Sequence, residues 1–146
     1  MRQEKVVRRV AVALVAALAL LVLGACGPNP SAANGNGDLI DVNVSTQTMT
    51  VWRNGRLVVG THVSTGKPST PTVLGRFTVY SKQSGWVHTD NGSVYSPLWF
   101  HGNYGVHGFG SVPSYPASHG CVRVPVGTMD AVYANAYVGM PVWVHT

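Results

Sequence analysis

The stretch Ser118-His119-Gly120-Cys121-Val122-Arg123 is the most informative part of this sequence of 146 residues. It places a cysteine after a glycine and two positions after a histidine, and a second histidine, His107, lies 14 positions upstream of Cys121. A cysteine attacks carbonyl groups as its thiolate, and a nearby imidazole can take the thiol proton. The pattern therefore predicts that Cys121 is a nucleophile. Because an ordinary thiol has a pKa of about 8.5, we expect the site to lower it.

Three further interpretations of the same residues are possible. His119 either stabilises the loop around Cys121 or takes part in catalysis, and the sequence leaves both open. Zinc accepts cysteine and histidine ligands, but the spacing of His107, His119 and Cys121 matches no common zinc motif. A buried, unreactive thiol is disfavoured because glycine and histidine residues surround Cys121. We therefore predict no metal site.

Residues 1–26 predict export and a lipid anchor. Four basic residues near the start precede an apolar stretch over 10–23, which is shorter than the roughly 20 residues of a membrane-spanning helix. The following Leu23-Gly24-Ala25-Cys26 resembles a bacterial lipobox, in which the cysteine is acylated and becomes the new N-terminus. The resemblance implies a signal peptide over 1–26 and a protein held at the cell envelope through Cys26, on the cell membrane or its periplasmic face. An uncleaved N-terminal anchor is the alternative.

The remainder of the chain predicts a flexible tether and one domain. Residues 27–37 read GPNPSAANGNG, a composition typical of a flexible linker, and residues 38–146 are enough for one core. The formal charge of +5 is misleading, because without the leader six basic residues face four acidic ones and form no cluster. This disfavours nucleic-acid binding. If Cys26 is acylated, Cys121 has no partner for a disulfide, which again favours a catalytic thiol.

The residue patterns predict a mainly β fold, a compact mixed sheet or sandwich with one short C-terminal helix. Asn54-Gly55 between two β-branched segments predicts a hairpin with a type I′ turn. Residues 82–120 are rich in Gly, Ser, Asn and Pro, and predict long loops around short strands. The only convincing helix of the domain is expected over Thr128–Tyr137, capped by Thr128 and ending near Gly139, with a closing strand over 141–145.

Four segments together resemble the L,D-transpeptidase catalytic domain family, also called YkuD. The first is Val63-Ser64-Thr65-Gly66-Lys67, continued by Thr70-Pro71-Thr72 and Gly75-Arg76-Phe77. The second is Val106-His107-Gly108, the third is the Ser118–Arg123 stretch, and the fourth is Gly139-Met140-Pro141-Val142. The similarity extends over residues 39–145, and the Ser118–Arg123 stretch is its most specific part.

The resemblance implies a role for each residue of the motifs. Cys121 would be the nucleophile, His107 would move its proton, and the Gly108 carbonyl would orient the imidazole. Backbone N–H groups around His119, Gly120 and Cys121 could form an oxyanion hole, because glycine permits the tight turn. The residues expected to bind the substrate or line its site are Ser118, Arg123, Tyr104, Trp99 and Tyr95. Arg123 would pair with a carboxylate of the substrate. The three aromatic residues could instead pack in the core or at its rim.

The family reaction would use tetrapeptide stems of peptidoglycan as donor and acceptor. Attack on the bond between the L-centre of the diamino acid and D-alanine would release D-alanine, and the acyl group would pass to an amine of another stem, giving a 3→3 cross-link. No cofactor is implied, and carbapenem-type inhibitors are expected to acylate Cys121. The alternatives are an L,D-carboxypeptidase, a stem-to-protein transferase and an inactive wall-binding module. A papain-like peptidase is disfavoured because its cysteine precedes its histidine.

Overall fold

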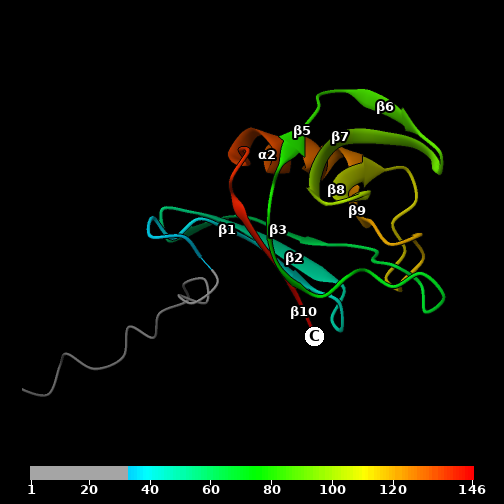
Figure 1. Ribbon diagram of the computed structural model, residues 1–146, viewed down its shortest axis with the longest axis horizontal. Helices are drawn as coiled ribbons and strands as arrows, with labels where there is room; N and C mark the ends of the chain where they lie inside the picture. Colours follow the sequence, from blue (N-terminus) through cyan, green and yellow to red (C-terminus); the bar gives the residue numbers. More distant parts are fainter. Residues whose placement is uncertain (1–32) are drawn as a thin grey trace, which may run out of the picture.

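The computed structural model describes residues 33–146, which form two five-stranded sheets and one helix (Figure 1). The predicted signal peptide, Cys26 and most of the predicted tether lie outside the described residues. In the part of the chain that is described, no helix is long and apolar enough to cross a membrane. The elements are β1 (Leu39–Asn43), β2 (Thr48–Arg53), β3 (Arg56–His62), β4 (Gly75–Thr78), β5 (Ser81–Lys82), β6 (Trp86–Thr89), β7 (Gly92–His101), β8 (Tyr104–Phe109), β9 (Val122–Pro125), α2 (Val126–Asn135) and β10 (Pro141–His145).

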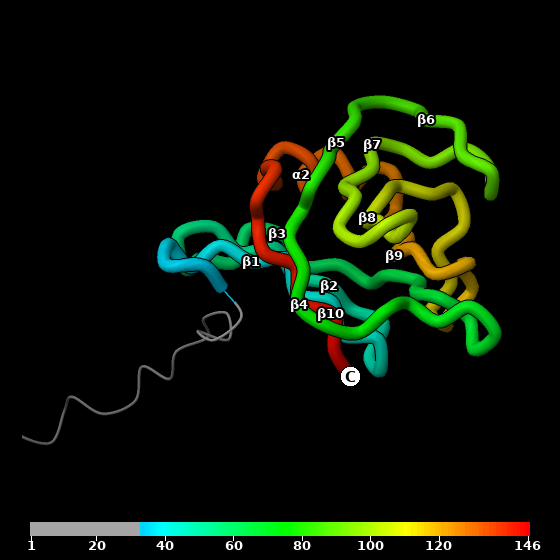
Figure 2. Tube along the Cα trace, viewed as in Figure 1, coloured from blue at the N-terminus to red at the C-terminus, as the bar shows by residue number. Residues whose placement is uncertain are grey.

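Both sheets are mixed, as the sequence predicts. The first has the order β3-β2-β1-β10-β4, with β1 and β10 parallel and the other pairs antiparallel. The second has the order β5-β7-β8-β9, with β6 on the side of β7, and only β8 and β9 are parallel. The first and last strands lie side by side, so the two ends of the domain meet in one sheet (Figure 2).

The hydrophobic core lies between the sheets because their strands alternate buried and more exposed residues. Val42 and Val51 of the first sheet and Leu98 and Val106 of the second are fully buried members of one cluster. Helix α2 contacts strands of both sheets and buries Met129 and Val132. The second sheet is thereby fixed against the first.

The predicted hairpin is confirmed. Asn54 and Gly55 have φ angles of 52° and 72°, and both central residues of a type I′ turn need positive values. Strands β2 and β3 pair on either side of this turn, with one irregularity between Val51 and Trp52.

The predicted ends of the helix are wrong. The helix begins at Val126, so Thr128 lies inside it, and Pro125 precedes the first turn with no side-chain cap. Proline is tolerated here because an N–H at the start of a helix has no partner within the helix. At the other end, Lys82 Nζ donates to the carbonyls of Tyr133 and Ala136 at 3.0 and 2.8 Å. A lysine from another strand therefore completes the C-terminus of the helix.

The prediction of long loops over residues 82–120 is wrong for most of that segment. Strands β5 to β8 occupy much of it, and an extended loop remains only over 110–121. The glycines of β8 are required by packing and not by turns. A Cβ on Gly105 would lie 2.7 Å from the Trp99 ring, and one on Gly108 would lie 3.0 Å from Tyr95.

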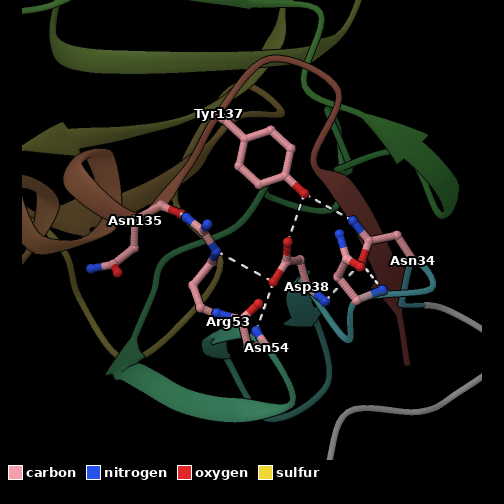
Figure 3. Close-up of polar contacts among 7 residues, drawn as sticks. Asn34, Asp38, Arg53, Asn54, Asn135 and Tyr137 are labelled. Atoms are coloured by element: carbon pink, nitrogen blue, oxygen red, sulfur yellow. Dashed lines mark hydrogen bonds and ion pairs between the residues drawn. The ribbon is translucent and has the colours of Figure 1, made fainter.

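A polar cluster closes the end of the domain where the described chain begins (Figure 3). Asp38, which is 3% exposed, accepts hydrogen bonds from Asn54 N–H at 2.7 Å, Tyr137 O–H at 2.8 Å and Arg53 Nε at 3.3 Å. Asn34 joins the cluster through its side-chain N–H, which donates to the Tyr137 hydroxyl. The ordered contacts of the domain therefore extend back to Asn34.

Candidate active site

A cavity of about 600 Å³ collects most of the predicted site residues. It is bordered by β7 and β8, by the turn between β6 and β7 and by the loop that precedes β9. The predicted residues that line it are Cys121, His107, His119, Arg123, Ser118, Tyr104 and Trp99. Tyr95 does not line it: its hydroxyl donates to Asp130 of α2 at 2.9 Å, and its ring lies against Trp86.

The parallel pairing of β8 and β9 brings Cys121 and His107 to one face. Val106 pairs with Val122, and His107 pairs with Arg123. Both valines are fully buried, so the residues that alternate with them face the opposite side, toward the cavity. Cys121 directly precedes Val122 and joins His107 and Arg123 there.

The imidazole of His107 is held in one orientation. Its side chain is buried, and Nδ1 lies 3.0 Å from the carbonyl oxygen of Gly108. Because a carbonyl only accepts, Nδ1 carries the proton and Nε2 is left with a lone pair. Burial lowers the pKa of His107 to about 4, with a further lowering from the charge of Arg123 and an opposing effect of the Gly108 hydrogen bond. The imidazole is therefore neutral near pH 7.

The thiol of Cys121 is also neutral at rest, contrary to the expectation of a lowered pKa. Burial raises the pKa of Cys121, while a backbone hydrogen bond from Gly105 and the charge of Arg123 act in the other direction. The thiol donates to the carbonyl of Asn103 at 3.3 Å. The resting site thus holds a neutral imidazole and a neutral thiol in one cavity.

The turn before Cys121 depends on Gly120. Its φ angle is +124°, and a Cβ there would lie 2.6 Å from the Tyr104 ring. The N–H of Gly120 donates to Ser118 Oγ at 3.0 Å, and the Ser118 hydroxyl donates to the Cys121 carbonyl. The Gly120 amide is thus used inside the turn, which leaves the amides of His119 and Cys121 as candidates for an oxyanion hole.

The segment over 64–67 supports this turn from the outside. Ser64 and Arg123 exchange two backbone hydrogen bonds at 2.9 and 3.0 Å. Ser118 N–H donates to the Thr65 carbonyl at 3.0 Å, and Lys67 N–H donates to the Ser118 carbonyl at 3.0 Å. The Ser64–Lys67 motif therefore holds the loop that carries Cys121, a role that its residues alone do not predict.

Thr72 and Gln47 complete this support, and sequence reasoning missed both. The Thr72 hydroxyl donates to the Gly120 carbonyl at 2.7 Å and accepts the Gly66 N–H at 2.8 Å. The amide of Gln47 accepts the Thr65 N–H at 2.8 Å and donates to the Thr65 hydroxyl at 2.6 Å. Thr72 belongs to the Thr70-Pro71-Thr72 motif, whereas no pattern in the sequence points to Gln47.

Arg123 and His119 both border the cavity. The guanidinium of Arg123 lies 4.2 Å from the centre of the Phe109 ring and has no carboxylate partner within residues 33–146. His119 is exposed, so its side chain borders the cavity without packing into the loop. No group of three or more His, Cys, Asp or Glu residues in this range is arranged to hold a metal ion.

Comparison with known proteins identifies relatives of the whole domain. A family model described as YkuD, the L,D-transpeptidase catalytic domain, matches residues 37–144. An L,D-transpeptidase of Xylanimonas cellulosilytica is 28% identical with a TM-score of 0.72, over 81% of this chain and 63% of that one. An L,D-transpeptidase from Mycobacterium smegmatis is 26% identical with a TM-score of 0.69, over 75% and 58%.

A third solved structure is an L,D-transpeptidase in complex with imipenem, 26% identical with a TM-score of 0.66. The match spans 74% of this chain and 59% of that one. The chain therefore spans less than two thirds of each of these relatives. No match was found among curated proteins.

Proposed function

Because the chain belongs to the L,D-transpeptidase catalytic domain family, we propose that it is a peptidoglycan L,D-transpeptidase with Cys121 as its nucleophile. The observation that carries the proposal is the shared cavity of Cys121 and His107, whose imidazole is fixed by the Gly108 carbonyl with Nε2 unprotonated. A neutral imidazole in the same cavity as a neutral thiol is suited to removing the thiol proton as the sulfur attacks an amide carbonyl.

The donor is a tetrapeptide stem that ends in D-alanine. The sulfur of Cys121 attacks the carbonyl of the diamino acid at its L-centre, and the thiol proton passes to Nε2 of His107. The oxygen of the tetrahedral intermediate is stabilised by backbone N–H groups of the turn, for which His119 and Cys121 are the candidates. Collapse of the intermediate breaks the C–N bond, and His107 returns the proton to the amino group of D-alanine.

The thioester that remains is resolved by an amine of a second stem. The amine nitrogen attacks the thioester carbon, the C–S bond breaks, and the acyl group forms the 3→3 cross-link. Arg123 is placed to pair with a carboxylate of the substrate, because its guanidinium borders the cavity without a carboxylate partner in the described residues. Trp99 and Tyr104 form walls of the same cavity.

Attack by water gives an L,D-carboxypeptidase, and attack by an amine of a protein gives a stem-to-protein transferase. The products of the full-length chain with a disaccharide-tetrapeptide separate the transpeptidase from the carboxypeptidase. Free D-alanine together with a cross-linked dimer supports the transpeptidase, whereas D-alanine with tripeptide alone shows a carboxypeptidase. Failure of the folded protein to release D-alanine contradicts both and favours a wall-binding module.

The proposed location is the cell envelope, with a lipid on Cys26. The support is the apolar stretch over 10–23 followed by the Leu23–Cys26 motif. Fatty-acid labelling in a bacterial host should mark the wild-type chain and leave Cys26→Ala unlabelled. Equal labelling of the two would contradict the anchor, without bearing on the reaction.

A further inference from the structure

Asp90 is the only carboxylate in residues 33–146 that lacks an interaction with another side chain. The other three acids of this range each have a partner within 3.3 Å. These pairs are Asp38 with Arg53, Asp41 with His145 and Asp130 with Tyr95. An exposed carboxylate without a partner is unremarkable on an open surface, but Asp90 borders the cavity that contains Cys121.

The turn that carries Asp90 is held by its own hydrogen bonds. It joins β6 to β7, whose ladder pairs Thr89 with Gly92. The Thr89 hydroxyl donates to the Gly92 carbonyl at 2.7 Å and accepts the Asn91 N–H at 3.3 Å. Since the strands on both sides are paired, the turn keeps Asp90 at the edge of the cavity.

The cavity is therefore bordered by two opposite charges that do not neutralise each other. Arg123 lies beside Cys121, and Asp90 belongs to the turn between β6 and β7. No ion pair within 4.0 Å joins the two side chains. Asp90 is the only acidic residue among those that line the cavity. A carboxylate without an ion-pair partner attracts a cation to its own edge of the cavity.

We propose that Asp90 selects the acceptor of the acyl group, by attracting the ammonium form of a primary amine to the cavity. This inference rests on the proposed function and concerns only its second half. Water carries no charge, so the carboxylate would favour transfer to an amine over hydrolysis. Asp90 is thus a specificity-determining residue and exchanges no proton itself.

Asp90 takes no part in the bond changes of the transfer step. The ammonium first releases one proton to water, and the free amine nitrogen then forms a C–N bond with the thioester carbon. The C–S bond breaks, and a proton of the attacking nitrogen passes through His107 to the sulfur of Cys121. Asp90 acts before these events, by increasing the occupancy of the amine near the thioester.

The test measures acyl transfer by the full-length chain to two different amines, with the tetrapeptide donor at a saturating concentration. A primary alkylamine is a cation at mildly alkaline pH, whereas hydroxylamine is uncharged. We expect Asp90→Asn to raise the KM for the alkylamine roughly two- to fivefold, the range for an exposed charge pair, and to leave the KM for hydroxylamine unchanged. The rate of D-alanine release without an acceptor should also stay unchanged, which shows that the variant is folded.

Asp130→Asn is the matched control, because Asp130 is an exposed acid of α2 that does not line the cavity. It should alter neither KM. Unchanged alkylamine kinetics in Asp90→Asn, or an equal change for both amines, would overturn the inference while D-alanine release continued to support the proposed function. A wild-type chain that releases no D-alanine would overturn the proposed function and this inference together.

Discussion

Nδ1 of His107 lies 3.0 Å from the carbonyl oxygen of Gly108, the next residue of the same strand. The contact fixes the tautomer and the ring orientation without a carboxylate. A carbonyl bears no formal charge, so it stabilises an imidazolium less than an aspartate does. The weak stabilisation by the carbonyl and the burial of His107 together explain why the imidazole stays neutral well below pH 6.5, its ordinary pKa.

The first prediction concerns acid stability. Because the pKa of His107 falls from 6.5 to about 4 on folding, the unfolded chain binds a proton first as the pH drops. The contribution of His107 to stability is complete above pH 6.5 and is lost as the pH falls toward 4, by about 3 kcal/mol. Urea denaturation of the wild type and of His107→Gln over this range should show that the variant lacks this part of the acid dependence.

His145 provides a contrast, because its pKa is raised by its contacts with Asp41 and the Thr146 carbonyl despite a lowering by burial. Its contribution is present below pH 6.5 and is lost as the pH rises through its folded pKa. The acid dependence should therefore persist in His145→Gln. If His107→Gln and the wild type lose stability in parallel between pH 6.5 and 4, the buried neutral imidazole is contradicted.

The second prediction concerns the hydroxyl of Thr72. Thr72→Val removes the hydrogen bond to the Gly120 carbonyl while keeping the shape of the side chain, and it leaves the Gly66 N–H without its acceptor. We expect a loss of about 1–3 kcal/mol of stability, because both groups are buried or partly buried. Thr72→Ser keeps the hydroxyl and should retain most of the wild-type stability. Equal stability of the valine and serine variants would show that the hydroxyl does not support the turn.

A third prediction follows from the polar cluster around Asp38. Hydrogen bonds from Asn54 and Tyr137 and the charge of Arg53 lower the pKa of this carboxyl, although desolvation by burial opposes them. Asp38→Ala removes the acceptor of the Asn54 N–H, the Tyr137 hydroxyl and Arg53 Nε, although the Arg53 guanidinium still donates to the Asn135 carbonyl (Figure 3). We expect a loss of about 2–3 kcal/mol in denaturant unfolding. The catalytic rate of the folded variant should be unchanged, since Asp38 does not line the cavity.

The fourth prediction is covalent inhibition. An L,D-transpeptidase similar to this chain was solved in complex with imipenem, and Cys121 borders a cavity that could admit such a ligand. Imipenem should add its mass once to the wild-type chain and not to Cys121→Ala. An adduct of the same size on the alanine variant would exclude Cys121 as the acylated residue.

The parts of the fold that the sequence predicted are those with a strong local signal. Asn54-Gly55 specifies a type I′ turn almost by itself, and the alternating residues of β1, β2 and β10 follow the two-residue period of a strand. The motif residues of the site were found because each has a distinctive chemical character. Cys121, His107 and Arg123 accordingly line one cavity.

The parts that could not be predicted depend on contacts between distant segments. Glycines in β8 resemble turn residues in the sequence, but they are present because Trp99 and Tyr95 leave no room for a Cβ. The lysine that completes the end of α2 comes from β5, more than 50 positions away. The raised pKa of Cys121 follows from its burial, which no motif specifies.

Cys121 is tested as the nucleophile most directly by intact-mass spectrometry of the full-length chain incubated with a disaccharide-tetrapeptide donor and no added acceptor. We expect an adduct with the mass of the donor minus D-alanine, present in the wild type and absent in Cys121→Ala. Release of D-alanine by a folded Cys121→Ala chain, or an adduct of equal abundance on it, would contradict the assignment of Cys121 as the nucleophile.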